Sequence, residues 1–136
     1  MSLSELFTLA TRPTPNLQKG KTRLEEKVEK DAAADQAWAL CLRVVDARDG
    51  LKCRCCHHRV IVTLELDPKR SEHHHLVKRR KEKALLTDSR NVIRVCLRCH
   101  QKLEKGQLKP IGKAADLFTL NGQTYLNADK PLRFIA

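Results

Sequence analysis

Aromatic residues are scarce in this chain of 136 residues, which has three Phe, one Tyr and one Trp. A core built on stacked aromatic rings is therefore not expected. The same scarcity argues against a platform for single-stranded bases, because such a platform needs several exposed rings.

Long apolar runs are also lacking. No stretch approaches the roughly 18 apolar residues that a membrane-spanning helix needs. The opening MSLSELFTLATRP has neither the basic start nor the apolar stretch of a signal peptide. We therefore expect a cytoplasmic protein with no membrane partner. Because thiols stay reduced in the cytosol, the six cysteines argue against a disulfide scaffold.

Acidic residues are few beside the basic ones, with 16 Asp and Glu against 27 Lys and Arg and a net charge of +11. Such an excess is typical of proteins that bind a polyanion such as DNA or RNA. A basic protein with no such partner is the plainer alternative. The length suits one domain with a modest core and some additional segments.

Three parts are expected along the chain. Residues 1–21 contain prolines and a glycine and predict an extended arm. Residues 22–110 predict a helix followed by the central domain, and residues 111–136 predict a C-terminal β-hairpin packed on the same domain. The hairpin is indicated by Asn121-Gly122 between two strand-like runs.

The first regular element is predicted to be a helix over residues 22–48. Thr22 is a suitable N-cap, with Glu25 three positions on as in a capping box, and Gly50 stops the helix. An apolar stripe at spacings of mostly three or four predicts core contact. Its members are Leu24, Val28, Ala33, Ala37, Leu40, Cys41, Val44 and Val45, and Trp38 is interpreted in the same way.

The central segment predicts two strands and a helix. Residues 59–66 are apolar and β-branched enough for a strand, and residues 71–77 can return as the second strand of a hairpin. The later segment from Arg90 is expected to begin irregularly and to become a helix from about Cys96 to Lys105.

Two CxxC pairs stand out, namely Cys53 with Cys56 and Cys96 with Cys99. Two intervening residues let a tight turn aim both sulfurs at one ion, and two such turns complete a tetrahedron. The pairs predict a closed, structural zinc site that stabilises a thin core. The alternative is four reduced thiols without a metal.

Two neighbours of the first pair need separate interpretation. Cys55 replaces Cys53 or Cys56 only by breaking the spacing, so it is left out of the predicted ligand set. His57 stands where many such turns have Gly, and His enters the left-handed backbone region more readily than most residues.

The order HHHLV, then SRNVIRVCLRCHQKLE, resembles the HNH nucleases that carry two CxxC pairs. The resemblance covers residues 48–106. It implies an α+β fold whose core is a ββα-metal motif, a β-hairpin followed by a helix that clasps one divalent ion. Here that core has a structural zinc site, follows a long helix and precedes the C-terminal hairpin. Small free-standing chains of this type look like bacterial or phage proteins, some of them linked to phage DNA packaging.

The resemblance also implies roles for individual residues. His75 is the general base that activates water, a task for which imidazole is suited at neutral pH. His74 and His100 hold the catalytic divalent cation, which is magnesium, manganese or nickel. Asn91 fastens the loop between hairpin and helix and keeps His75 oriented.

The register of the three histidines leaves an alternative. Strict alternation along a strand places His73 beside His75 and turns His74 to the other face. The resemblance instead implies His74 as the ligand next to His75, and we favour it because the strand ends there and need not alternate cleanly. His73 is then a supporting or DNA-facing residue.

Glu104 departs from the family pattern, in which many relatives have a second helix histidine at this position. A pair at i and i+4 shares one helix face, so His100 and Glu104 are expected to bind the same ion. A carboxylate favours hard ions such as magnesium or manganese. The alternative is an exposed carboxylate with no ligand role.

Basic residues near these histidines predict contacts with the phosphates of double-stranded DNA, with little sequence preference. They are Lys78, Arg79, Arg80, Arg94 and Arg98. The expected function is that of a metal-dependent DNA endonuclease. A non-catalytic zinc module that binds nucleic acid is the main alternative, and a protein-interaction zinc domain is a weaker one.

Overall fold

The computed structural model describes residues 22–78 and 81–136. The arm expected at 1–21 and the predicted phosphate contacts Arg79 and Arg80 lie outside the described residues. The chain divides into two units, Met1–Asp35 and Gln36–Ala136. The paired cysteines and the central histidines all belong to the second unit.

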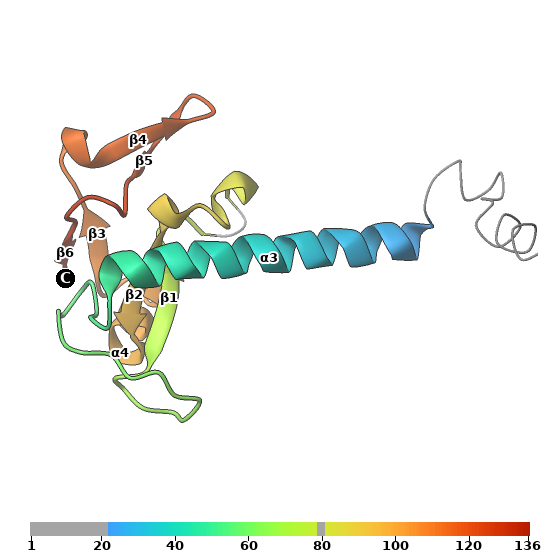
Figure 1. Cartoon of the computed structure of the whole chain (residues 1–136). Coiled ribbons are helices and arrows are strands. Elements are labelled where there is room, and N and C mark those ends of the chain that lie inside the picture. The colour runs from blue at the N-terminus through green and yellow to red at the C-terminus, as the bar shows by residue number, and fades with distance from the viewer. Residues whose placement is uncertain (1–21, 79–80) are drawn as a thin grey trace, which may run out of the picture. The chain divides into compact units, whose positions relative to one another are not determined.

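The long helix α3 spans Arg23–Asp49 (Figure 1). As predicted, Thr22 Oγ1 accepts a hydrogen bond from Glu25 N at 3.2 Å, and Gly50 ends the helix with a φ of +62°. Among the described helices, none is both long and apolar enough to cross a bilayer.

The predicted core face of α3 is only partly correct. Cys41 and Val45 are buried, and Trp38 packs against the same cluster. Four other members of the apolar stripe are at least half exposed, namely Leu24, Val28, Leu40 and Val44. Within the second unit, the packed side of the helix is the one that carries Cys41 and Val45, which contact Val92.

The central sheet is an antiparallel pair of β1, Ser71–His75, and β2, Val92–Cys96. This pairing corrects two expectations. The segment 59–66 is not a strand and forms only isolated bridges at Arg59 and Ile61. The true partner of β1 is the segment that was expected to be irregular.

Burial explains why the second apolar run became the strand. All five residues of β2 are buried, whereas Val62, Leu64 and Leu66 are 72%, 101% and 82% exposed. An apolar run gains by forming a strand only where other elements cover it, because the gain comes from packing and burial.

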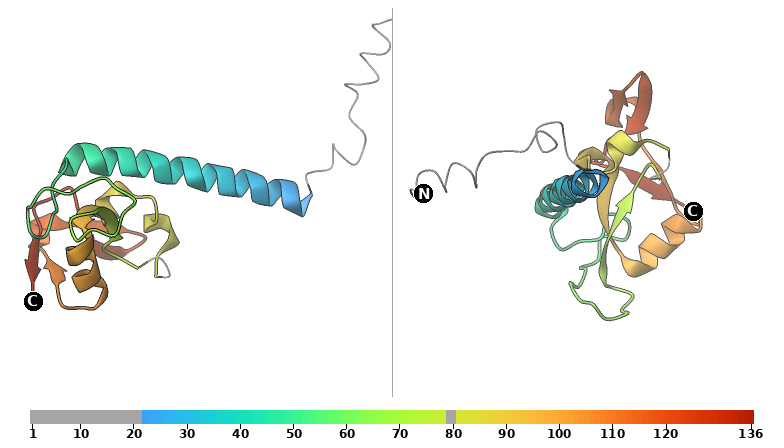
Figure 2. Two further views of the ribbon diagram at one scale, coloured as in Figure 1. Left: turned by 90° about the horizontal axis from the view of Figure 1, so that it is seen from below. Right: turned by 90° about the vertical axis from the view of Figure 1, so that its right-hand side faces the viewer.

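The β1–β2 hairpin lies between two helices. Strand β2 leads directly into α4, Leu97–Glu104, whose bounds are close to those of the predicted helix. The helix ends before Gly106, which has a φ of +73°. Figure 2 shows the C-terminal part of α3 on one face of the hairpin and α4 on the other. Val92 packs with the α3 residues, and Ile93 packs in the cluster that contains Leu103 of α4.

The C-terminal region forms two further antiparallel pairs. Strand β3, Lys109–Ile111, pairs with β6, Arg133–Ile135. Strand β4, Leu117–Leu120, pairs with β5, Gln123–Leu126. The predicted Asn121-Gly122 turn is confirmed, with φ values of +52° and +78°, the positive values that a two-residue type I′ hairpin requires. Short 3-10 helices cover Lys83–Leu85, Ser89–Asn91 and Ala114–Asp116.

Ion pairs tie the end of α3 to the C-terminal region. Arg54 bridges Asp49 Oδ1 and Ala128 O, each at 2.8 Å, and Arg48 reaches Asp129 Oδ1 at 3.0 Å. Burial alone would raise the pKa of Asp49, but the hydrogen bond from Arg48 and the backbone hydrogen bond from Arg94 bring it below its usual range. The buried carboxylate is therefore charged and fully paired.

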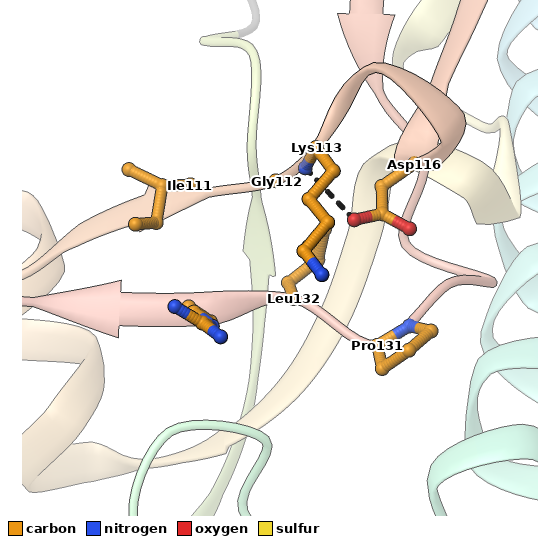
Figure 3. Close-up of a pocket in the computed structure, with 7 residues that line it drawn as sticks. Ile111, Gly112, Lys113, Asp116, Pro131 and Leu132 are labelled. Carbon is orange, nitrogen blue, oxygen red and sulfur yellow. Dashed lines mark hydrogen bonds between the residues drawn. The ribbon is translucent and has the colours of Figure 1, made fainter.

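A hollow of about 390 Å³ lies between the C-terminal segments (Figure 3). Its walls include Ile111, Pro131 and Leu132, and Lys113 N donates to Asp116 Oδ2 at 2.8 Å beside it. No cysteine or histidine lines this hollow. The clustered metal-ligand side chains lie elsewhere.

Candidate metal centres

Four cysteines come together where β2 meets α4. Their Sγ atoms all lie within 4.8 Å of one another, and Cys56 Sγ is 4.0 Å from Cys96 Sγ. Sulfurs at about 2.3 Å from a tetrahedral zinc are roughly 3.8 Å apart. Cys53, Cys56, Cys96 and Cys99 could therefore hold a structural metal such as zinc.

Local backbone geometry aims these sulfurs. In the first turn His57 N donates to Cys53 O at 2.9 Å, and His57 adopts a φ of +63°. This left-handed conformation is the one expected for His57, which follows the second cysteine of the pair. In the second turn Cys96 caps α4, because its Sγ accepts a hydrogen bond from Cys99 N at 3.4 Å.

The buried thiols alter one another's acidity. A hydrogen bond from the Cys55 thiol is the main cause that lowers the pKa of Cys53 to about 4. Burial raises the pKa of Cys56 and of Cys99 above the ordinary thiol value. Cys55, which the spacing argument left out, thus lies beside the cluster and favours the thiolate form of Cys53, the form that binds metals.

A second cluster contains the three predicted catalytic ligands. His74 comes from β1, while His100 and Glu104 come from α4, and their ligand atoms lie within 4.8 Å of one another. Glu104 Oε1 is 3.3 Å from His74 Nδ1 and 3.3 Å from His100 Nε2. The two imidazole rings are 5.3 Å apart at 70°.

The nitrogen Nδ1 of His74 is buried and has no hydrogen-bond partner among the described residues, although Glu104 Oε1 is within ion-pair distance. Burial, followed by the charge of His100, lowers the pKa of His74 to about 4. The ring is therefore neutral at pH 7. An unpaired buried nitrogen costs free energy, and a divalent cation bound by the three side chains would satisfy it.

The strand alternates regularly through the three histidines. His74 faces His100 on the α4 side, whereas His73 and His75 both contact Trp38 of α3. The expectation that the strand end would break the alternation was wrong. Even so, His74 is the histidine in the cluster, while His73 Nε2 lies 2.7 Å from Asp46 Oδ1.

His75 stands outside the three-residue cluster. Its Nε2 lies 2.8 Å from Leu86 O. Its ring stacks on the indole of Trp38, with centroids 5.1 Å apart and planes at 16°. The predicted base is thus held between the first helix and the connection that follows β1.

Asn91 is buried and fastens that connection. Its Oδ1 accepts from Val77 N at 2.8 Å, and its Nδ2 donates to Leu85 O at 3.1 Å. Its carbonyl accepts from Leu76 N at 2.8 Å. The fastened loop joins β1 to β2 and does not join the hairpin to the helix, because β2 continues into α4 without a loop.

The predicted phosphate contacts differ in exposure. Lys78 and Arg98 are exposed. The prediction of a phosphate contact at Arg94 is contradicted by its burial. Arg94 lies under α3, and its Nε donates to Ser71 Oγ at 2.7 Å. A second hydrogen bond joins its guanidinium to Gly50 O at 3.0 Å. Arg94 therefore supports the fold and is not available to DNA.

Three neighbours of the histidines were missed by sequence reasoning, namely Trp38, Asp46 and Leu86. Trp38 was interpreted as a core contact, and no spacing rule joins a helix position to a histidine in a strand 37 residues later. Their roles depend on how α3 packs over the hairpin. Only the side of the helix on which Trp38 lies could have been read from the apolar pattern.

The two clusters are mechanically linked through α4. Cys96 is the N-cap of this helix and Cys99 lies in its first turn, and His100 and Glu104 follow within its eight residues. A metal on the cysteines would therefore fix the helix that presents two ligands of the second cluster.

No protein-family model, curated protein or solved structure matches the chain.

Proposed function

We propose that the protein is a metal-dependent endonuclease of the HNH type that hydrolyses phosphodiester bonds in double-stranded DNA. The observation that carries the proposal is the cluster of His74, His100 and Glu104 around a buried imidazole nitrogen that has no hydrogen-bond partner among the described residues. Two imidazoles and one carboxylate form a donor set suited to a divalent transition metal, and the carboxylate also accepts magnesium or manganese.

Each metal would have its own protein ligands and its own task. A cation held by His74, His100 and Glu104 would supply Lewis-acid stabilisation of the charge that develops on the phosphate and on the leaving oxygen. Zinc held by the four cysteines would be structural, because a closed set of four thiolates leaves no open position.

His75 is proposed as the general base. A carbonyl only accepts hydrogen bonds, so the contact with Leu86 O places a proton on Nε2, and Nδ1 is the nitrogen proposed to accept the proton of the water. In the reaction a water oxygen bonds to phosphorus, its proton passes to His75 Nδ1, and the bond from phosphorus to the 3′ oxygen breaks.

The placement of His75 is compatible with this role. His74 and His75 are consecutive, so their Cα atoms are about 3.8 Å apart. A base must reach the attacking water and need not share a strand face with the metal ligands.

Asn91 would maintain this geometry without touching the substrate. By binding Val77 and Leu85 through its amide it holds the connection that also provides Leu86 O. The acceptor for His75 is therefore fixed relative to β1. Precise placement of a catalytic group depends on support of this kind.

The charge of the protein favours a DNA substrate. The net charge of +11 attracts a polyanion, and the exposed Lys78 and Arg98 flank the segments that carry the histidines. Lysine and arginine contacts to phosphates position a duplex but do not read its sequence. Cleavage is therefore expected at many sequences.

The test is cleavage of supercoiled plasmid by the purified protein with magnesium, manganese or nickel, and with EDTA as the metal-free control. We expect nicked or linear product with at least one cation and none with EDTA. His75→Ala should remove activity, whereas His58→Ala, at an exposed histidine outside the cluster, should retain it. DNA binding without cleavage under every cation would overturn the proposal in favour of a non-catalytic zinc module.

A further inference from the structure

The only tryptophan of the chain lies flat against the proposed base. Trp38 and His75 are nearly parallel, at 16°, with ring centroids 5.1 Å apart. Trp38 is partly buried and packs against Cys41, Val45 and Val92. The indole is thus held by the α3–β2 contact and presents one face to the imidazole.

Stacking on Trp38 and the hydrogen bond to Leu86 O both restrict the position of the His75 ring. Stacking on Trp38 restricts the plane of the imidazole, and the hydrogen bond to Leu86 O restricts its rotation within that plane. A ring fixed in both respects keeps its Nδ1 in one direction.

The indole is itself supported from the side. His73 meets Trp38 edge-on, with centroids 6.4 Å apart at 80°, and His73 Nε2 lies 2.7 Å from Asp46 Oδ1. Because Trp38 and Asp46 both belong to α3, this contact pins the helix to β1 at two points. His73 therefore has a supporting role on the face opposite to the metal ligands.

We propose that Trp38 is a positioning residue for His75, so that α3 forms one wall of the nuclease site and is more than an N-terminal addition. The proposal rests on the nuclease function argued above. It predicts that loss of the indole lowers the turnover rate and leaves the affinity for DNA unchanged. Trp38 contacts the proposed general base, His75, and is not among the proposed phosphate contacts.

The experiment compares Trp38→Leu, Trp38→Phe and the matched control Leu40→Ala, which lies on the same helix at a position that is 60% exposed. Cleavage of a duplex oligonucleotide gives kcat and KM for each full-length variant. Trp38→Leu should lower kcat by about 10-fold to 100-fold, since small misplacements of a catalytic group have effects of this size. Its KM should stay within about 2-fold of the wild-type value, because Trp38 is not a proposed DNA contact and ground-state binding should not change.

Trp38→Phe should recover most of the lost kcat, because a phenyl ring also stacks on imidazole. Leu40→Ala should behave like the wild type. The positioning role would be overturned if the wild type is active and Trp38→Leu keeps the wild-type kcat, or if Trp38→Leu raises KM alone. An inactive wild type would instead overturn the nuclease function, so the two failures are distinguishable.

A second measurement is made on the wild type and does not depend on activity. In proton–carbon NMR spectra the His75 ring protons of the wild type should lie upfield of those of His100, because an aromatic ring shields protons above its face. His75→Gln assigns the signals. Ring protons of His75 without this upfield displacement would show that the stack is absent in solution and would overturn the proposal.

Discussion

Cys56 Sγ lies 4.0 Å from Cys96 Sγ although 40 residues separate the two cysteines. The contact joins the turn that follows α3 to the junction of β2 with α4. Whatever holds these sulfurs together therefore also fixes the two ends of the central segment, which carries all three adjacent histidines.

Removal of one cysteine ligand should loosen this junction. We expect one zinc per chain in the purified protein, measured by elemental analysis. Cys53→Ser and Cys99→Ser should lose it, and their thermal midpoint should fall by more than about 10 °C, because a structural zinc contributes folding free energy directly. Cys41→Ser should keep the zinc, since Cys41 is buried in the separate α3 cluster. A folded protein without bound metal would contradict the zinc hypothesis.

The two neighbouring histidines His73 and His74 should differ in their effect on the catalytic cation. His74→Ala removes a proposed ligand and should raise the metal concentration needed for half-maximal cleavage by about 10-fold or more, the scale on which single site residues act. His73→Ala removes a residue bound to Asp46 and should leave that concentration nearly unchanged. Metal titrations of cleavage measure both values, and the opposite ranking would assign the ligand to His73.

Glu104 offers a test of ligand chemistry. Glu104→Gln removes the negative charge but keeps the size, so it should weaken the catalytic cation while zinc stays bound. Glu104→His should shift the preference from magnesium or manganese toward nickel or zinc, because imidazole suits these metals better. Glu65→Gln, at an exposed carboxylate, is the matched control. Wild-type metal dependence in Glu104→Gln would leave His74 and His100 as the protein ligands.

Asn91→Ala should destabilise the protein as well as slow cleavage. The substitution removes the partner of Val77 N and one of the two partners of Leu85 O, which also accepts from Asp88 N. An unpaired buried backbone group costs about 1–3 kcal/mol. Urea unfolding should show the loss, whereas Gln101→Ala on the exposed side of α4 should change the free energy of unfolding little. Unaltered stability in Asn91→Ala would mean that the loop is held by other contacts.

Substitutions of exposed and of buried basic residues should have different effects on DNA binding and on stability. Arg98→Ala and Lys78→Ala should each reduce the slope of log affinity against log salt by about one unit, as expected for one lost phosphate contact. Arg94→Met should leave the slope intact and lower stability, because Arg94 bonds to Ser71 and Gly50 inside the protein. Binding measured at several salt concentrations decides, and unchanged slopes for the exposed pair would mean that they face solvent only.

Elements with strong local signals were predictable from the chain alone. The N-cap at Thr22, the stop at Gly50 and the Asn121-Gly122 turn all appear as expected, because capping and turn geometry depend on residues within a few positions of one another. The pairing of the CxxC turns was predictable for the same reason. Each turn is local, and one ion requires two of them.

The partner of β1, the burial of Arg94 and the surroundings of His75 were decided by tertiary structure. Two apolar runs, 59–66 and 92–96, could each have formed the strand, and only the second lies where helices cover both faces. The stack of Trp38 on His75 follows from that same packing. Local sequence specifies which backbone conformations are favourable, but burial depends on what the rest of the chain places over each surface, and that is known only once the chain has folded.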